Sequence, residues 1–159
     1  MKVWFPWISL AARLVLGGVM LVAGALKVTD PETAAQAVRA YELLPSALVQ
    51  PVGWGLPFLE IAIGLLLIVG FGVRASAVAA GVFMIVFIAA VSSAWARGLS
   101  IDCGCFGGGG QVAAGQTKYL QEILRDVGLL ALAVWLWWQP VSKFAVVAES
   151  QGPQGVTAS

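Results

Sequence analysis

The sequence contains no histidine and only two cysteines among its 159 residues. The absence of histidine removes the commonest metal ligand and general base, any His-ligated haem, and every Ser-His or Cys-His catalytic arrangement. Two cysteines are too few for a disulfide scaffold or a four-cysteine zinc site. Any chemistry at a site in this chain therefore rests on two thiols, a few carboxylates, and lysine or arginine side chains.

Charge is also scarce. Charged residues make up 11% of the chain, the net charge is +1, and hydrophobic residues make up 60%. Soluble domains have about 25% charged and about 45–50% apolar residues. Nucleic-acid binding is disfavoured because it needs many Lys and Arg contacts to phosphate, and the nine basic residues here are scattered. The mean hydropathy of +0.90 indicates that the lipid bilayer is the main partner of a single domain.

Four apolar runs are long enough to cross the hydrocarbon core, which needs about 20 helical residues. We predict transmembrane helices at about residues 6–27, 46–72, 75–97 and 119–139. The fold class is therefore an all-α membrane protein, with a four-helix bundle in residues 1–142. The tryptophans between residues 135 and 138 mark a membrane boundary, since indole rings favour the headgroup interface. The polar tail, 143–159, is predicted to be disordered.

Two features near the start of the chain need interpretation. A cleaved signal peptide is the alternative interpretation of the first apolar run, but Arg13 interrupts the run, and the other three helices need a fourth to return the chain. After this run, Thr29 or Asp30 can cap a helix that has Pro31 at its first position. Residues 34–44 then alternate apolar and polar side chains at helical spacing. We predict a short amphipathic helix that lies on the membrane surface between the first two transmembrane helices.

The two cysteines form the motif Cys103-Gly104-Cys105 in a glycine-rich loop after the third predicted span. Gly104 permits the tight bend that a disulfide between them requires. Such a small ring departs from relaxed disulfide geometry and is easily reduced, and closing so short a loop adds little stability. The flanking glycines are expected to leave the sulfur exposed to a partner. We interpret the pair as a redox-active dithiol/disulfide.

Other interpretations of the pair remain open. The cysteines can be two reduced thiols packed as small hydrophobes, or a thiolate pair that hands on a soft metal ion as cargo. A metal carrier would benefit from further Cys or Met along a helix, and only Met20 and Met84 lie within predicted helices. A non-catalytic membrane subunit that scaffolds a partner is a further alternative. No resident metal site is predicted.

The isolated charges in the apolar runs are candidate site residues, because an ionisable group in lipid is usually paired or functional. Glu60 is expected to pair with Lys27, Arg97 or Arg125 inside the bundle. Such a pair either fixes helix packing or places a proton-handling carboxylate near the cysteines. The same three cations would lower the pKa of the attacking cysteine by favouring its thiolate. Asp126 is expected to serve at the helix start or in a pair.

Several short segments together resemble the MauE branch of the DoxX-like membrane proteins. Their order and spacing carry the resemblance over roughly residues 10–140. The segments are Gly24-Ala25-Leu26-Lys27, Asp30-Pro31, Tyr41-Glu42-Leu43-Leu44-Pro45, Leu56-Pro57-Phe58-Leu59-Glu60 with Gly64, Arg97-Gly98, and Asp102-Cys103-Gly104-Cys105-Phe106-Gly107. Arg125-Asp126 stands where such proteins often have Arg-Asn, which leaves the role of Asp126 open.

The resemblance implies a multi-pass inner-membrane protein with both termini in the cytoplasm and the cysteine loop outside. The wider group is redox-associated, and its bundle is similar to that of vitamin K epoxide reductase, which passes electrons between thiols and a quinone. The resemblance thus implies a thioredoxin-like extracytoplasmic partner, with a lipid quinone as a candidate second carrier. It also implies a role in the maturation of disulfide-containing proteins, which in the MauE case is methylamine dehydrogenase.

A count of basic residues predicts the opposite orientation under the positive-inside rule. Near the predicted cysteine side lie Lys27, Arg39, Arg97, Lys118 and Arg125, and on the other side lie Lys2, Arg74 and Lys143. Several of the first five lie within a turn of helix ends, where they can pair with acids. We therefore follow the resemblance in predicting an extracytoplasmic cysteine loop.

Overall fold

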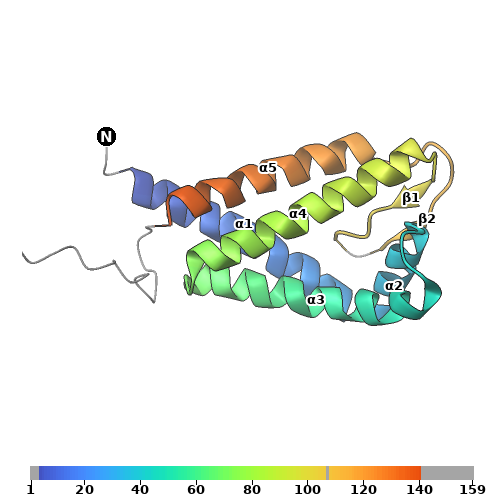
Figure 1. The fold of residues 1–159 in the computed structure, drawn as a ribbon, viewed down its shortest axis with the longest axis horizontal. Coiled ribbons are helices and arrows are strands. Elements are labelled where there is room, and N and C mark those ends of the chain that lie inside the picture. The colour runs from blue at the N-terminus through green and yellow to red at the C-terminus, as the bar shows by residue number, and fades with distance from the viewer. Residues whose placement is uncertain (1–3, 107, 141–159) are drawn as a thin grey trace, which may run out of the picture.

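The structure is a computed structural model that describes residues 4–106 and 108–140. In these residues the chain forms α1 (Phe5–Val28), α2 (Pro31–Ala40), α3 (Ser46–Val69), α4 (Val73–Ala96), β1 (Ile101–Asp102), β2 (Gly110–Gln111) and α5 (Tyr119–Trp138). The four long helices run along the long axis of the molecule, and α2 and the two strands lie together at one end (Figure 1). We call this end the cysteine end, because Cys103 and Cys105 directly follow β1.

Three helices, α1, α3 and α4, are each 24 residues long and apolar enough to cross a membrane. The protein is therefore a mostly helical, multi-pass membrane protein. The helix α5 occupies the place of the fourth predicted span and is 20 residues long. It differs from the other three in carrying Glu122, Arg125 and Asp126 in its first turns. Because of these charges, α5 is not among the helices of the described residues that length and composition alone identify as membrane spans.

Glycine and proline set the helix ends. The helix α3 ends at Val69, three residues before the predicted end, because Gly70 adopts a left-handed conformation with φ of 80°. At the start of α2, the Asp30 carboxylate accepts a hydrogen bond from the backbone N–H of Thr33 at 3.1 Å. The helix α2 ends at Ala40, four residues short of the predicted alternation. The predicted disordered tail, 143–159, lies outside the described residues.

The backbones of α1 and α3 touch through small residues. A Cβ atom added to Gly17 would lie 2.9 Å from the Gly64 carbonyl oxygen, and one added to Gly64 would lie 2.8 Å from that of Gly17. A Cβ at Gly24 would lie 2.7 Å from the carbonyl oxygen of Pro57. Membrane helices associate in this way, since small residues allow the close van der Waals packing that drives association in lipid.

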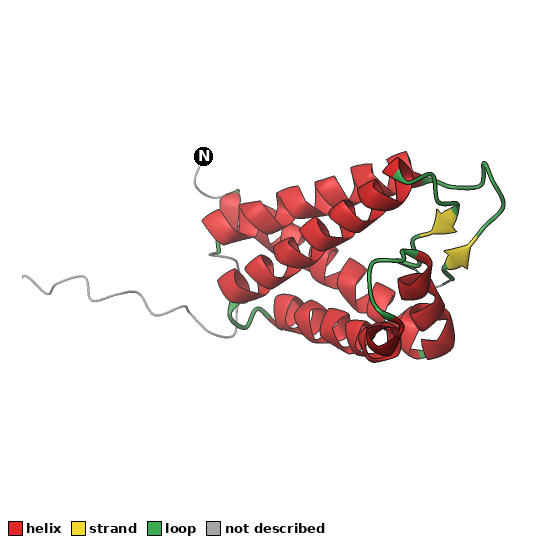
Figure 2. Cartoon of the chain, turned by 45° about the vertical axis from the view of Figure 1, so that its right-hand side comes forward, coloured by secondary structure: helices red, strands yellow, loops and turns green. Residues whose placement is uncertain are grey.

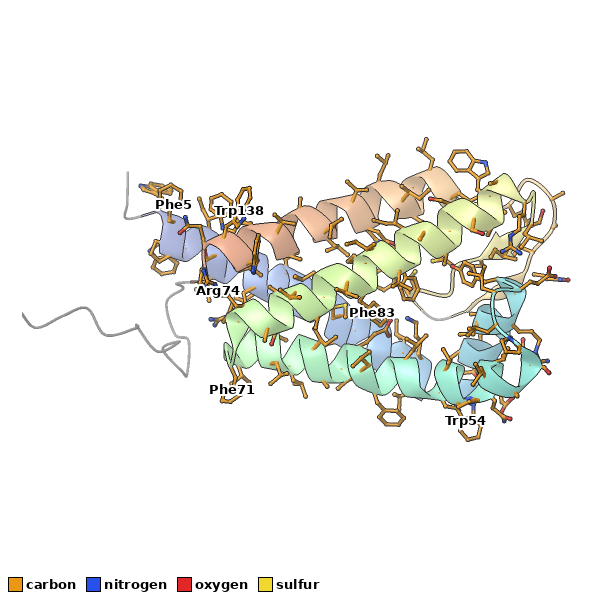
Figure 3. The ribbon with its side chains drawn as sticks, in the orientation of Figure 1. Phe5, Trp54, Phe71, Arg74, Phe83 and Trp138 are labelled. Carbon is orange, nitrogen blue, oxygen red and sulfur yellow. The ribbon has the colours of Figure 1, made fainter. Side chains whose placement is uncertain are left out.

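The two ends of the bundle differ in character. Side chains of Phe5, Phe71, Arg74 and Trp138 gather at the end where α1 begins (Figure 3). At the cysteine end the strands stand beside α2 (Figure 2), and α2 packs against both of them. A separate apolar cluster forms there, and it includes Tyr41, Cys103 and Tyr119. The cysteines are thus part of a packed layer and not of a free loop.

Candidate functional site

The cysteine motif forms the tip of a short β-hairpin. Ile101 pairs with Gln111 and Asp102 pairs with Gly110 in antiparallel register. A Cβ at Gly104 would lie 2.7 Å from the Cβ of Ala37 on α2, and the φ of Gly104 is 68°. Only glycine suits this position, because it tolerates both the left-handed backbone and the close approach of the helix. The motif is therefore seated directly on α2.

Two tyrosines fix the hairpin from either side. The Tyr41 hydroxyl donates a hydrogen bond to the Cys103 carbonyl oxygen at 3.4 Å. The Tyr119 hydroxyl accepts the backbone N–H of Ile101 at 3.1 Å and donates to the carbonyl oxygen of Leu99. These bonds satisfy backbone groups of a hairpin that is too short to hold its own position.

Arg97, predicted to act on the cysteines, lies elsewhere. Its guanidinium donates to the backbone carbonyl oxygens of Tyr41 and Ser93, and its side chain is exposed. Arg97 therefore positions Tyr41, whose hydroxyl binds the backbone of Cys103. The sequence could not show whether Arg97 contacts the cysteine thiols or only the backbone of Tyr41, because it does not show which way the end of α4 faces.

The two cysteines are free thiols in unequal surroundings. Cys103 is buried, with 5% of its surface exposed, whereas Cys105 is partly exposed. The prediction that the glycines leave the sulfur exposed is wrong for Cys103, because the loop is packed between α2 and α5. The backbone N–H of Cys105 donates to the Cys103 sulfur at 3.3 Å, and the two thiols are hydrogen-bonded to each other.

The surroundings separate the two thiols by acidity. The hydrogen bond from Cys103 lowers the pKa of Cys105 below its usual range; burial opposes this effect, and the positive charges of Arg125 and Lys27 add to it. The same hydrogen bond, together with burial, raises the pKa of Cys103. Of the two thiols, Cys105 is therefore the one whose thiolate is favoured, and the thiolate is the form that nucleophilic attack requires.

Glu122 is a site residue that the sequence analysis missed. Its side chain lies beside Cys103, and ligand atoms of Glu122, Cys103 and Asp102 lie within 4.8 Å of one another. One thiol and two hard carboxylates are not the thiolate set that a soft ion prefers. The available signal was spacing, because Glu122 lies three residues before Arg125 and so shares a helix face with it.

Behind the cysteines lie two ion pairs. The Arg125 guanidinium binds Asp126 Oδ1 through two nitrogens, at 2.8 and 2.9 Å. Lys27 Nζ lies 2.5 Å from Glu60 Oε1, and both side chains are less than a tenth exposed. Of the three cations predicted as partners of Glu60, Lys27 is the one that pairs with it.

A small cavity lies between these groups. Its volume is about 30 Å³, and Cys105, Arg125, Asp126 and Glu60 all contribute to its lining. The rest of the wall is apolar and includes Phe83, whose side chain lies within the bundle (Figure 3). The cavity therefore connects the partly exposed Cys105 with both ion pairs.

The comparisons with known proteins agree with the resemblance noted from the sequence. The family model described as methylamine utilisation protein MauE matches residues 5–139. No curated protein and no solved structure matches the chain. The matched range includes all five helices and the hairpin, and so the whole of the candidate site. The chain therefore belongs to the MauE family of methylamine utilisation proteins.

Proposed function

We propose that this protein is a membrane thiol–disulfide redox protein, in which Cys103 and Cys105 exchange electrons with a thioredoxin-like extracytoplasmic partner. The observation that carries the proposal is the asymmetry of the pair. Cys105 is the partly exposed cysteine, with a cation beside its thiol, and Cys103 is the buried cysteine, with a carboxylate beside it. An attacking and a resolving thiol need these two environments.

When the partner is oxidised, the Cys105 thiolate attacks one partner sulfur, the partner disulfide breaks, and its other sulfur leaves as a thiolate. Cys103 then passes its proton to the Glu122 carboxylate, bonds to the Cys105 sulfur and displaces the partner. Two electrons have moved to the partner, and the Cys103 proton returns to a partner thiolate by way of Glu122. In the reverse direction the same groups reduce the partner.

The membrane arrangement follows from the burial of the charges on α5. Asp126 is buried, and Glu122 and Arg125 are only partly exposed, so these charges face the protein and leave an apolar face for lipid. The helix α5 is thus the fourth span, and α2 lies on the outer membrane surface beneath the hairpin. Four spans put both termini on one side, and the family resemblance supports a cytoplasmic position for that side and an extracytoplasmic position for the cysteine end.

The substrate class follows from family membership. The MauE family is named for methylamine utilisation, and the resemblance implies a role in maturing disulfide-containing proteins such as methylamine dehydrogenase. A lipid quinone is the candidate second electron carrier, but the inner cavity does not admit its ring. At about 30 Å³ this cavity has the size of about two water molecules. A quinone would therefore have to bind outside it.

Trapping the mixed disulfide tests the proposal. Because Cys105 attacks and Cys103 resolves, Cys103→Ser should accumulate a DTT-sensitive adduct on non-reducing gels. Mass spectrometry of this adduct should identify a partner peptide that is disulfide-bonded to Cys105. The matched variant Cys105→Ser should not accumulate it. The proposal fails if neither variant forms an adduct and the wild-type pair never oxidises in cells. Loss of soft-cation binding in both variants, without an adduct, would instead favour the metal carrier.

A further inference from the structure

Each of the two ion pairs leaves one buried carboxylate oxygen without a partner. Glu60 binds Lys27 through Oε1, and Asp126 binds Arg125 through Oδ1. Glu60 Oε2 and Asp126 Oδ2 are both buried and have no hydrogen-bond partner. A buried acceptor in this state costs free energy unless it binds a water molecule or a proton.

The cavity supplies a place for that water or proton. Asp126 and Glu60 are 3% and 2% exposed, respectively, and both line the cavity together with Cys105. A water molecule needs roughly 10–15 Å³ of such volume and two to four polar partners. The volume of about 30 Å³ therefore has room for about two waters, which can bridge the two carboxylates and the sulfur.

The net charge around the cavity depends on the redox state of Cys105. The groups that face Asp126 are Arg125 from α5, Lys27 from α1, Glu60 from α3 and Cys105 from the hairpin. Glu122 lies one helical turn before Asp126 and beside Cys103, and α4 lines the cavity only with apolar side chains. Glu122 does not line the cavity, so the groups there that can be anionic are Asp126, Glu60 and Cys105, which meet the two cations Arg125 and Lys27. An unbalanced charge in such a buried set is expensive, and the set lowers its free energy by binding a proton.

We infer that Asp126 and Glu60 share one proton through the cavity water while Cys105 is a thiolate, and release it when the disulfide forms. The inference rests on the proposed function and adds an internal proton store to it. In the reduced state, the shared proton balances the thiolate. Oxidation of the pair removes the thiolate charge, leaves two cations against two carboxylates, and expels the proton.

The balanced step therefore releases two protons with two electrons. One proton comes from the Cys103 thiol and the other from the carboxylate pair. The oxidant is the partner disulfide, which takes up both electrons and both protons to become a dithiol. An ordinary pair with one thiolate and no store would release only one proton, so the number of protons released identifies the store.

Proton counting against a glutathione buffer tests the inference. The full chain in lipid nanodiscs is equilibrated with reduced and oxidised glutathione across the pH range in which Cys105 is a thiolate and glutathione is a thiol. Oxidation of two glutathione thiols to the disulfide also releases two protons, so the wild-type equilibrium constant should not change with pH. For Asp126→Asn and Glu60→Gln, which need no shared proton, the constant for oxidation should fall about tenfold per pH unit. Glu32→Gln, which changes an exposed carboxylate on α2, should behave as wild type.

A second measurement covers variants that do not fold. Infrared difference spectra of the wild-type protein should show a carboxylic acid C=O band that is present in the dithiol form, lost on oxidation and shifted in D₂O. The inference is overturned if this band is absent, if the wild-type constant changes tenfold per pH unit, or if folded variants stay independent of pH. Failure of the wild-type pair to form a disulfide even in fully oxidised glutathione would contradict the proposed function itself. Oxidation with the wrong proton count would contradict only the proton store.

Discussion

The Lys27–Glu60 pair makes a quantitative prediction about stability. The two charged atoms lie 2.5 Å apart, and the side chains are 8% and 3% exposed. In Glu60→Gln the side chain keeps its size and one acceptor but loses its charge, which strands the buried ammonium. Breaking a buried pair from one side costs about 3–5 kcal/mol. Lys27 keeps its contact with the Phe87 ring, whose centroid is 5.5 Å from Nζ. We therefore expect the free energy of unfolding to fall by about 3 kcal/mol, near the lower end of this range.

The loss should depend on the redox state. In the disulfide form, Glu60→Gln leaves Lys27 and Arg125 against Asp126 alone, whereas in the dithiol form the Cys105 thiolate supplies a second negative charge. The free energy of unfolding should therefore fall further for the oxidised protein. Reversible unfolding by SDS titration in mixed micelles measures the free energy of unfolding of each form. A reducing buffer keeps the protein in the dithiol form, and an oxidising buffer keeps it in the disulfide form.

A double-mutant cycle separates the pair from its surroundings. Lys27→Met combined with Glu60→Gln removes both charges, so its loss should be well below the sum of the two single losses. Glu32→Gln is the control and should change stability by no more than about 0.5 kcal/mol. The electrostatic argument is refuted if Glu60→Gln is as stable as wild type, or if the two single losses simply add.

Further measurements address the hairpin and the thiols. Gly104→Ala should lower the free energy of unfolding by roughly 1–3 kcal/mol. Adding Ala37→Gly should restore only the part of this loss that comes from the steric contact, since the left-handed backbone at residue 104 remains. An unchanged free energy of unfolding in Gly104→Ala would contradict the close packing of the hairpin on α2. Arg125→Gln removes a cation beside Cys105, so the pKa of that thiol should rise and its alkylation at neutral pH should slow; an unchanged pH profile would exclude Arg125 as an activator. In intact, reduced cells, impermeant maleimide should label Cys105, and labelling only after permeabilisation would reverse the orientation.

The long helices could be predicted from the sequence, because a run of apolar residues long enough for the bilayer has few other solutions. Their ends were less certain, since Gly70 acts on backbone conformation and leaves the hydropathy pattern unchanged. The faces that carry Glu60 and Lys27 also follow from helical spacing. Their pairing does not, because spacing within one helix says nothing about the rotation of its neighbour.

The cysteine end could not be predicted in the same way. Each strand of the hairpin is two residues long, too short to show an alternating pattern. The glycines around it indicate a flexible loop, whereas at Gly104 the missing side chain permits close packing on Ala37. Helical spacing places Glu122 on the same face as Arg125, but the sequence does not show that this face of α5 lies next to Cys103.

The burial of Cys103 also gives the exchange a direction. Sulfur displacement proceeds in line, with the entering and leaving sulfurs on opposite sides of the one attacked. Cys103 is 5% exposed, so a partner sulfur bonds to Cys105 and not to Cys103. When Cys103 then attacks Cys105, the partner sulfur leaves from the side of Cys105 that faces away from Cys103. The position of Cys103 in the hairpin, which is seated on α2, thus sets the line along which the partner sulfur leaves.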